Sequence, residues 1–316
     1  MKLPISAYGI ALYDEIGFLS VDYAYDGKLT LINSTKKKNS WEWDDRWEHY
    51  EKEVPEELMS GERRIKPLIT NLIDDSPIED IPTAWLKLQL ISMRYFKPNE
   101  LNLENIFEIL PNIVWGDETI ERAPASLKGL DATFEQGYAN SSVDKFPPMT
   151  RYVIPSGVRI ADTRRVRLGA YLGEGTTVMH EGFVNYNAGT EGPNMIEGRI
   201  SAGVYVGKDS DLGGGSSTMG TLSGGNKEVI SIGERCLLGA NSGIGISLGD
   251  DCTVEAGLYL TGGTKVTLLN ENKVVKALEL SGKDGILYFR DSLSGKVCAR
   301  PNKSEFKLNK VLHDNN

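Results

Sequence analysis

The chain has few of the residues that build disulfide frameworks and zinc sites. Its three cysteines, Cys236, Cys252 and Cys298, are widely spaced and form no CxxC pair. A disulfide-stabilised or zinc-binding domain needs more ligands at closer spacing, so we expect reduced thiols and a cytoplasmic protein. Only three histidines are present, which argues against a zinc enzyme that uses several of them.

A long hydrophobic run and an excess of positive charge are also missing. No apolar stretch approaches the length needed to span a bilayer, and Met1 to Pro4 do not begin a signal peptide. Lysine and arginine number 35 against 44 aspartates and glutamates, so the formal net charge is −9. Nucleic-acid binding depends on a basic surface. We therefore expect neither a membrane partner nor a nucleic-acid partner.

Glycine is abundant, with 34 residues, and many glycines follow aliphatic residues that recur every six positions. A period of six fits neither an amphipathic helix nor an alternating strand, but it is typical of a hexapeptide-repeat parallel β-helix. A β-sandwich does not keep a fixed period of six over so many units. The repeat positions, all aliphatic except Thr190, are Ile160, Val166, Leu172, Val178, Val184, Thr190, Ile196, Ile200, Val206, Leu212, Ile232, Leu238, Ile244, Leu248, Val254, Leu260 and Val266.

This repeat predicts a mainly β fold, a left-handed parallel β-helix over residues 158–268. Each aliphatic side chain should point into a three-sided prism, with glycine where the backbone turns tightly. Each coil needs neighbours, and both ends need caps. Residues 219–231 interrupt the period, so we expect them to form an external loop at a corner, where loops commonly line ligand sites.

Residues 1–115 have no repeat and predict a separate α/β domain. The helix expected over 83–96 has Thr83 as its N-cap and Pro98 beyond its end, and its stripe of Trp85, Leu88, Ile91 and Tyr95 should be core. The other expected elements are strands at 6–12, 17–25 and 28–32 and a helix at 103–110. Residues 116–157 should connect the domains, and residues 269–316 should form a small β cap that includes a strand at 286–290.

Five strings within the repeat together carry a resemblance to a known family. They are the stretch from Val178 to Thr190, Met195-Ile-Glu-Gly-Arg199, Gly213-Gly-Gly-Ser-Ser217, Thr221-Leu-Ser-Gly-Gly225 and Leu237-Leu-Gly-Ala-Asn-Ser-Gly243. They resemble tetrahydrodipicolinate N-succinyltransferases, in the branch with an α/β N-terminal domain. The likeness covers about residues 146–292, and the first 115 residues fit it only in outline.

The resemblance implies an acyltransferase of diaminopimelate and L-lysine biosynthesis. Such an enzyme moves a succinyl group from succinyl-CoA to the amine of ring-opened tetrahydrodipicolinate. The family is a homotrimer, with each active site in a groove between two prisms.

Two residues compete for the catalytic role. Other hexapeptide acyltransferases use a histidine as the base, and His180 is the only histidine in the repeat. The family instead places a catalytic carboxylate at the position of Glu197. Glu197 follows the inward Ile196, so its side chain should face outward. It could act as a general base or as a nucleophile that forms an acyl anhydride.

The resemblance also assigns cofactor and metal residues. Arginine suits the carboxylate or phosphates of succinyl-CoA because its planar fork binds bidentately. An axial magnesium site would use Glu181, but the aspartate that accompanies it in the branch falls on Arg164 here, with Asp162 nearby. The expected succinyl-CoA contacts are Arg199, Gly214, Ser217, Ala240, Glu255, Ala256, Gly263, Lys276, Phe289, Arg290, Asp291 and Ser292.

Two alternative functions remain open from the sequence. One is another acyl-CoA-dependent N-acyltransferase, for instance one with an acetyl donor. The other is a non-catalytic solenoid, either a scaffold or a metal protein like the γ-carbonic anhydrases, although the latter needs several histidines.

Overall fold

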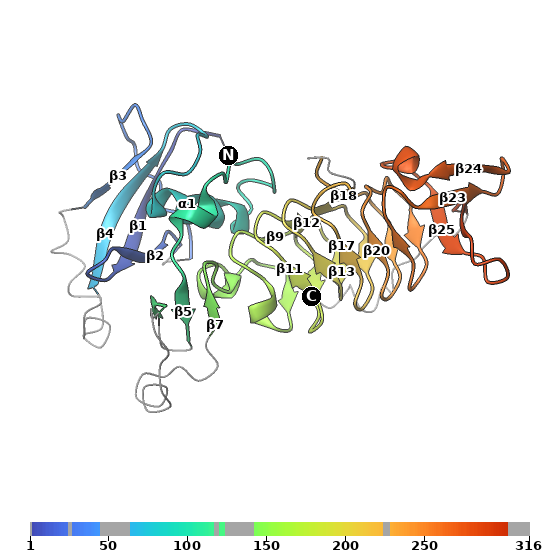
Figure 1. The fold of residues 1–316 in the computed structure, drawn as a ribbon. Helices are drawn as coiled ribbons and strands as arrows, with labels where there is room; N and C mark the ends of the chain where they lie inside the picture. The colour runs from blue at the N-terminus through green and yellow to red at the C-terminus, as the bar shows by residue number, and fades with distance from the viewer. Residues whose placement is uncertain are drawn as a thin grey trace. The chain divides into compact units, whose positions relative to one another are not determined.

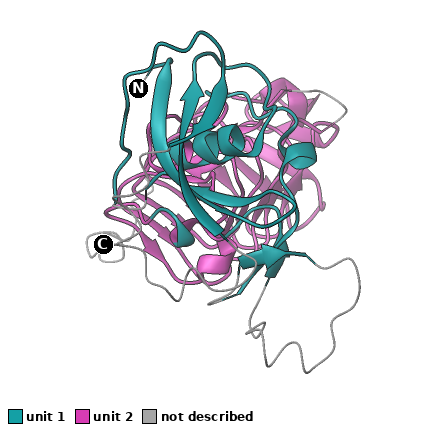
Figure 2. Cartoon of the chain, turned by 90° about the vertical axis from the view of Figure 1, so that its left-hand side faces the viewer, with its two compact units in different colours: residues 1–90, 100–147, 151–153 teal, residues 91–99, 148–150, 154–316 magenta. Residues whose placement is uncertain are grey.

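The computed structural model describes residues 2–24, 27–44, 64–116, 120–123, 142–223 and 228–302. The chain divides into two compact units, shown in Figure 2. Unit 1 comprises Met1–Leu90, Glu100–Pro147 and Arg151–Val153, and unit 2 comprises Ile91–Asn99, Pro148–Thr150 and Ile154–Asn316. None of the helices in the described ranges is both long and apolar enough to cross a membrane.

A four-stranded antiparallel sheet forms the centre of unit 1, with strand order β2-β1-β4-β3 (Figure 1). The strand predicted at 28–32 is wrong. Only Leu31 pairs with β1, as an isolated bridge to Ala7, because β2 already occupies that edge of β1 from Ile10 onward. The strands are β1 (Ile5–Tyr13), β2 (Phe18–Asp22), β3 (Ser40–Trp43) and β4 (Arg64–Leu72).

Helix α1 (Ile81–Ser92) is tied to this sheet through Tyr23 and Gln89. The Gln89 side chain accepts a hydrogen bond from Tyr23 N at 2.8 Å and donates one to Val21 O at 2.7 Å. The Tyr23 ring lies over Gly9, where a Cβ would come within 2.7 Å of it. Trp85, Leu88 and Ile91 are buried, as the helical stripe predicted.

Both ends of α1 differ from the prediction. The cap is Asp80, whose carboxylate accepts a hydrogen bond from Thr83 N at 2.7 Å, whereas the buried Thr83 hydroxyl has no partner in the described structure. The helix ends at Ser92, before Arg94 takes a positive φ of 65°. The second helix, α2 (Ile106–Ile109), is a single turn and shorter than the predicted 103–110.

The stretch expected to connect the domains contains regular structure. Strands β5 (Ile113–Trp115), β6 (Ile120–Arg122) and β7 (Ser142–Asp144) form an antiparallel sheet with β5 in the centre. The Trp115 indole donates to Asp144 O at 2.9 Å. The strands are only three residues long, which left no periodic signal in the sequence.

Unit 2 is a left-handed parallel β-helix, as predicted (Figure 1). Every repeat position from Val166 to Val266 is buried inside the prism. The long sheet contains β8 (Arg159–Ile160), β10 (Thr176–Val178), β13 (Asn194–Ile196), β16 (Ser210–Leu212), β19 (Leu237–Leu238) and β21 (Thr253–Val254). The second sheet, here called the site sheet, contains β11 (Phe183–Val184), β14 (Arg199–Ile200), β17 (Ser217–Thr218), β20 (Gly243–Ile244) and β22 (Tyr259–Leu260). The third sheet contains β9 (Tyr171–Leu172), β12 (Gly189–Thr190), β15 (Tyr205–Val206) and β18 (Ser231–Ile232).

The C-terminal cap is built onto the last coil. Strand β25 (Ile286–Arg290) pairs in parallel with β21 and so extends the long sheet. The predicted strand at 286–290 is therefore confirmed. The sheet then continues through β26 (Val297–Pro301), β23 (Lys265–Leu268) and β24 (Lys273–Lys276). Short 3-10 turns occur at Met149–Arg151, Thr163–Arg165 and Ala277–Leu280.

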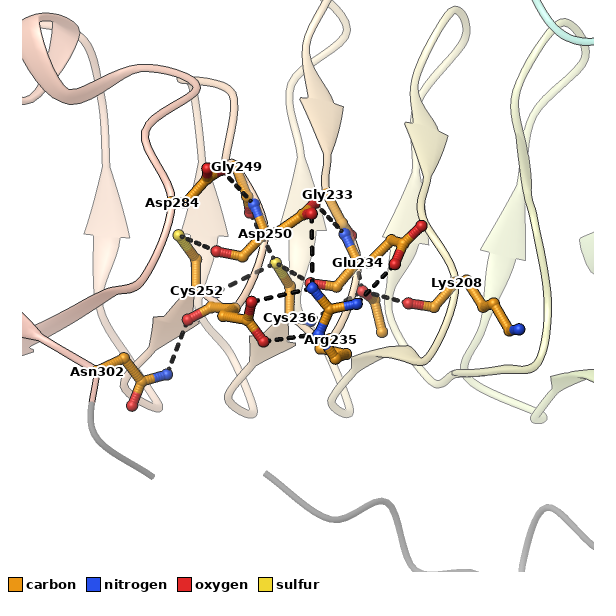
Figure 3. A network of polar contacts seen from close by, with 12 residues as sticks. Lys208, Gly233, Glu234, Arg235, Cys236, Gly249, Asp250, Cys252, Asp284 and Asn302 are labelled. Carbon is orange, nitrogen blue, oxygen red and sulfur yellow. Dashed lines mark hydrogen bonds and ion pairs between the residues drawn. The ribbon is translucent and has the colours of Figure 1, made fainter. Parts of the chain in front are cut away.

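One edge of the prism carries a network of charges centred on Arg235 (Figure 3). Arg235 has a φ of 55°, a left-handed conformation that costs energy for a residue with a Cβ. Its guanidinium contacts Asp251 through two hydrogen bonds of 2.7 and 3.0 Å and Glu234 through one of 2.6 Å. These ion pairs help to hold the strained residue in place.

Beneath this network, Ser210, Cys236 and Cys252 occupy equivalent positions on successive coils. The Ser210 hydroxyl donates to Gly233 O at 2.8 Å, and the Cys236 thiol donates to Gly249 O at 3.0 Å. The thiols thus serve as hydrogen-bonding groups between coils. All three cysteines are buried and free, as expected for reduced thiols.

Candidate active site

The turns that join the long sheet to the site sheet form one edge of the prism, here called the site edge. It comprises residues 179–182, 197–198, 213–216, 239–242 and 255–258. In the central turn, Ser216 N donates to Gly213 O at 2.9 Å, and Gly215 at the third position has a φ of 69°. This is the geometry of a type II turn, which favours glycine at that position. The corner itself therefore requires a glycine at Gly215.

Glu197 lies on the site edge directly after the buried Ile196 and is partly exposed. Its backbone N–H donates a hydrogen bond to Leu212 O at 2.8 Å, which fixes the backbone position from which the side chain extends outward. A Cβ on Gly214 would lie 3.4 Å from Glu197 Oε2. The carboxylate therefore faces the glycine-rich turn of the next coil. The sequence prediction that Glu197 points outward is confirmed.

Arg199 begins the adjacent strand of the site sheet, two residues after Glu197. Its guanidinium donates to Ser217 Oγ at 2.7 Å, and the two residues are paired in register. Arg199 is exposed and has no carboxylate partner among the described residues. An exposed guanidinium beside a carboxylate and a row of glycines can bind an anionic acyl donor.

The expected cofactor contacts continue along the site edge toward the C-terminus. Ala240, Glu255 and Ala256 are exposed in the next two turns. The Glu255 carboxylate accepts a hydrogen bond from Arg290 N at 2.8 Å, which places the end of β25 on the same edge. Phe289 precedes Arg290 and lies under the Arg300 guanidinium at 5.7 Å.

The remaining expected contacts lie apart from this edge. Gly263 is in the turn that follows β22, at the opposite border of the site sheet, with open space where a Cβ would be. Lys276 ends β24 and is exposed. Asp291 and Ser292 form the turn after β25, where Asp291 accepts a hydrogen bond from the Ser294 hydroxyl. The structure thus brings most of the predicted residues to the site edge and the adjoining strands of the site sheet. Gly263, Lys276, Asp291 and Ser292 lie apart from that edge.

The two remaining candidates, His180 and Glu181, occupy the site-edge turn before Glu197, and both are exposed. Arg164 forms an ion pair with Asp162 at 3.2 Å. Within the described parts of the chain, no three His, Cys, Asp or Glu side chains gather to hold a metal. A single chain therefore offers at most Glu181 as one ligand of a shared site.

Sequence reasoning missed Phe183, which is paired with Arg199 on the site sheet, and Arg165 and Arg167, which flank the bridge of Val166 to that sheet one coil earlier. The six-residue period could not have found them, because the coils differ in length and only the strand pairing aligns them. Val166 bridges Val184, and Phe183 pairs with Arg199, so counting back one and two coils from Arg199 gives Phe183 and Arg165.

Comparison with known proteins identifies the family. A model described as the hexapeptide repeat of succinyl-transferase matches residues 229–262. A 2,3,4,5-tetrahydropyridine-2,6-dicarboxylate N-succinyltransferase of Pseudomonas putida is 57% identical over 258 residues, which cover 79% of this chain and 75% of the relative. The chain belongs to this family of N-succinyltransferases. It is therefore an acyltransferase of the succinylase type, as the sequence indicated.

Two further comparisons extend the match. The N-succinyltransferase of Vibrio cholerae is 52% identical over 259 residues, covering 79% of this chain and 75% of the relative. A crystal structure of a putative 2,3,4,5-tetrahydropyridine-2-carboxylate N-succinyltransferase from Campylobacter jejuni has a TM-score of 0.77 at 28% identity. That match covers 94% of this chain and 92% of the other, so the succinyltransferase fold extends over nearly the whole chain.

Proposed function

We propose that this chain transfers the succinyl group of succinyl-CoA to the amine of ring-opened tetrahydrodipicolinate, within diaminopimelate and L-lysine biosynthesis. The products are CoA and N-succinyl-2-amino-6-oxopimelate. The observation that carries the proposal is the 57% identity to a named N-succinyltransferase across most of the chain. The facing positions of Glu197 and Gly214 support it, because they place a carboxylate opposite a turn whose backbone is exposed.

Acyl transfer to an amine needs a group that accepts the amine proton and a donor for the oxyanion. Glu197 is the proposed catalytic group and Gly214 N–H the proposed oxyanion donor. As a base, Glu197 takes the proton while the amine attacks the thioester carbon and the C–S bond breaks. As a nucleophile, its carboxylate oxygen first displaces CoA to form an anhydride, which the amine then opens.

The proposed binding of succinyl-CoA runs from Arg199 toward the end of the solenoid. Arg199 binds the succinyl carboxylate, and the turns at Gly214, Ala240 and Ala256 leave room for the pantetheine arm close to the backbone. The exposed cations Lys276 and Arg290 border the same face and suit phosphates. Ser217, Glu255, Gly263, Phe289, Asp291 and Ser292 complete the proposed contacts.

We also propose a homotrimer, with the active sites between neighbouring prisms. A structural Mg²⁺ on its axis would take one Glu181 carboxylate from each chain, since carboxylate oxygens are suitable ligands. The exposed position of Glu181 allows this, but Arg164 contributes a cation in place of a second ligand. Sedimentation before and after treatment with a chelator tests the assembly and its dependence on the ion. A trimer that contains no metal before that treatment would refute the magnesium site.

The activity is tested by release of CoA thiol from succinyl-CoA with and without tetrahydrodipicolinate. We expect release that depends on the acceptor and that is lost by more than about 100-fold in Glu197→Gln. A folded Glu197→Gln enzyme with near-normal turnover would remove Glu197 from the mechanism. Exchange of labelled CoA into succinyl-CoA without acceptor would indicate the anhydride route, and its absence would indicate the general base.

Two comparisons separate the alternatives. Faster thiol release from acetyl-CoA than from succinyl-CoA would indicate an acetyltransferase. A scaffold would show no heat of CoA binding by calorimetry.

A further inference from the structure

Two long polar side chains on the site sheet point toward one another. Arg199, on β14, extends toward the next coil, where its guanidinium donates to Ser217 Oγ at 2.7 Å. Tyr259, on β22, extends back toward the preceding coil, where its ring lies over Gly243. Ser217 and Gly243 are themselves paired in register, so the two long side chains meet over neighbouring strands.

The position of the Tyr259 ring depends on the missing side chain at Gly243. A Cβ on Gly243 would lie 2.6 Å from Tyr259 Cζ and still closer to Cε2, so any other residue there would push the ring away. Glycine in a strand often marks such a close approach of another group. Because Cζ lies over Gly243, the hydroxyl that it carries continues in the same direction, toward Ser217.

The two side chains keep hydrogen-bond donors available. Tyr259 is 45% exposed, and its hydroxyl has no partner among the residues that the structure describes. Packing over Gly243 uses only the ring carbons and does not need the hydroxyl. Paired strands are roughly 5 Å apart, a separation that a carboxylate with a hydrogen bond at each oxygen can span. A guanidinium and a phenol on neighbouring strands can therefore bind one carboxylate together.

We propose that the Tyr259 hydroxyl binds the carboxylate of the succinyl group together with Arg199, and that it thereby selects a dicarboxylic acyl donor. This inference rests on the proposed function, in which Arg199 binds that carboxylate. Tyr259 lies on the C-terminal side of Arg199, where the proposed cofactor contacts extend. A donor whose acyl chain ends in a methyl group would leave both polar side chains without their anion, and a site built for hydrogen bonding discriminates against such an analogue.

The test compares two acyl donors that differ only at the end of the acyl chain. In butyryl-CoA a methyl group replaces the carboxylate of succinyl-CoA. Thiol release at saturating tetrahydrodipicolinate gives kcat/KM for succinyl-CoA, and competition against succinyl-CoA gives the inhibition constant of butyryl-CoA. For Tyr259→Phe we expect kcat/KM to fall roughly 10- to 100-fold, the range of one hydrogen bond to a charged group. The inhibition constant should change less than about threefold, because the ring remains in place.

Tyr171→Phe is the matched control. Tyr171 and Tyr259 each begin a two-residue Tyr-Leu strand, but β9 belongs to the third sheet and β22 to the site sheet. The control should leave both constants unchanged. An unchanged kcat/KM in Tyr259→Phe, an equal loss of affinity for butyryl-CoA, or the same loss in Tyr171→Phe would overturn the proposal. If the wild-type enzyme releases no thiol from succinyl-CoA in the presence of tetrahydrodipicolinate, the proposed function itself fails.

A second variant tests the same contact without changing either polar residue. Gly243→Ala places a methyl group where the ring lies and should turn Tyr259 away from Arg199. We expect the same selective loss with succinyl-CoA. The double variant Gly243→Ala with Tyr259→Phe should then lose no more than either change alone, because both remove one contact. Additive losses in the double variant would show that the two residues act independently and would overturn the proposed arrangement.

Discussion

Gly198 and Gly214 flank the proposed catalytic carboxylate, and the structure gives them different roles. A Cβ on Gly198 would lie 2.1 Å from Ser216 Oγ and 2.7 Å from Ser216 O, so the neighbouring coil leaves it no space. A Cβ on Gly214 would meet only Glu197 Oε2 at an ordinary contact distance. Gly198 is thus required by packing between coils, whereas Gly214 keeps the approach to Glu197 open.

This difference predicts opposite outcomes for two alanine variants. Gly198→Ala should destabilise the solenoid by about 1–3 kcal/mol, because the backbone of the adjacent turn must move. Gly214→Ala should keep its stability within about 0.5 kcal/mol but lose most of its turnover, because a methyl group would occupy the approach to the Glu197 carboxylate. Urea unfolding followed by circular dichroism and the thiol-release assay measure the two effects. A stable Gly198→Ala protein would contradict the packing argument.

The N-cap of α1 is a second residue-scale test, because the sequence indicated Thr83 and the structure shows Asp80. Asp80→Ala should lower stability by about 0.5–2 kcal/mol, since it removes the acceptor for Thr83 N. Thr83→Val should be nearly neutral, because its buried hydroxyl makes no hydrogen bond in the described structure. Urea unfolding followed by tryptophan fluorescence, to which Trp85 on the same helix contributes, compares them. A larger loss in Thr83→Val would restore Thr83 as the cap.

At the scale of the elements, many corners of the solenoid use a residue with positive φ, and most of these residues are glycine, asparagine or aspartate. Arg235 is the exception, and its neighbours on the following coil compensate for it. Hydrogen bonding to Arg235, and then its charge, hold the pKa of Asp251 below its usual value, although slight burial acts in the opposite direction.

A lowered pKa makes the contribution of Asp251 to stability depend on pH. The contribution is complete above the unfolded-state pKa of about 4 and is lost as the pH falls through the lower folded-state pKa. Asp251→Asn, which keeps a side chain suited to positive φ, should therefore lower the melting temperature at pH 7. The difference from wild type should shrink toward pH 3. A difference that stays constant would mean that the ion pair does not contribute.

At the scale of the whole molecule, the two units carry separate spectroscopic probes. All five tryptophans fall within unit 1, and all three cysteines fall within unit 2. Tryptophan fluorescence therefore follows the unfolding of one unit and thiol labelling follows that of the other. Because all three cysteines are buried, native protein should react slowly with a thiol reagent and denatured protein should react at three sites.

The Asp14–Arg122 ion pair tests whether these probes separate the units. Burial acts to raise the pKa of Asp14, but hydrogen bonds from Arg122 and from the Gly17 amide lower it more, so the net shift is downward. At pH 7 Asp14→Asn should lower the stability of unit 1 by at most about 1 kcal/mol. The effect should fade as the pH drops below about 4, through the lowered pKa. It should appear in tryptophan fluorescence and be smaller in thiol labelling, and an equal shift of both probes would show that the units unfold together.

The sequence by itself determined the solenoid and the family. A six-residue period fixes which side chains point inward, because each coil repeats the same local geometry, and the strings around Glu197 and Gly214 are local in the chain. The tertiary structure decided what depends on distant contacts. It assigned the cap of α1 to Asp80, rejected the strand at 28–32 in favour of one bridge and joined β25 to the long sheet. It also brought Phe183 beside Arg199, with Arg165 one coil further back, because coils that contain different numbers of residues are aligned only by hydrogen bonds between strands far apart in the chain.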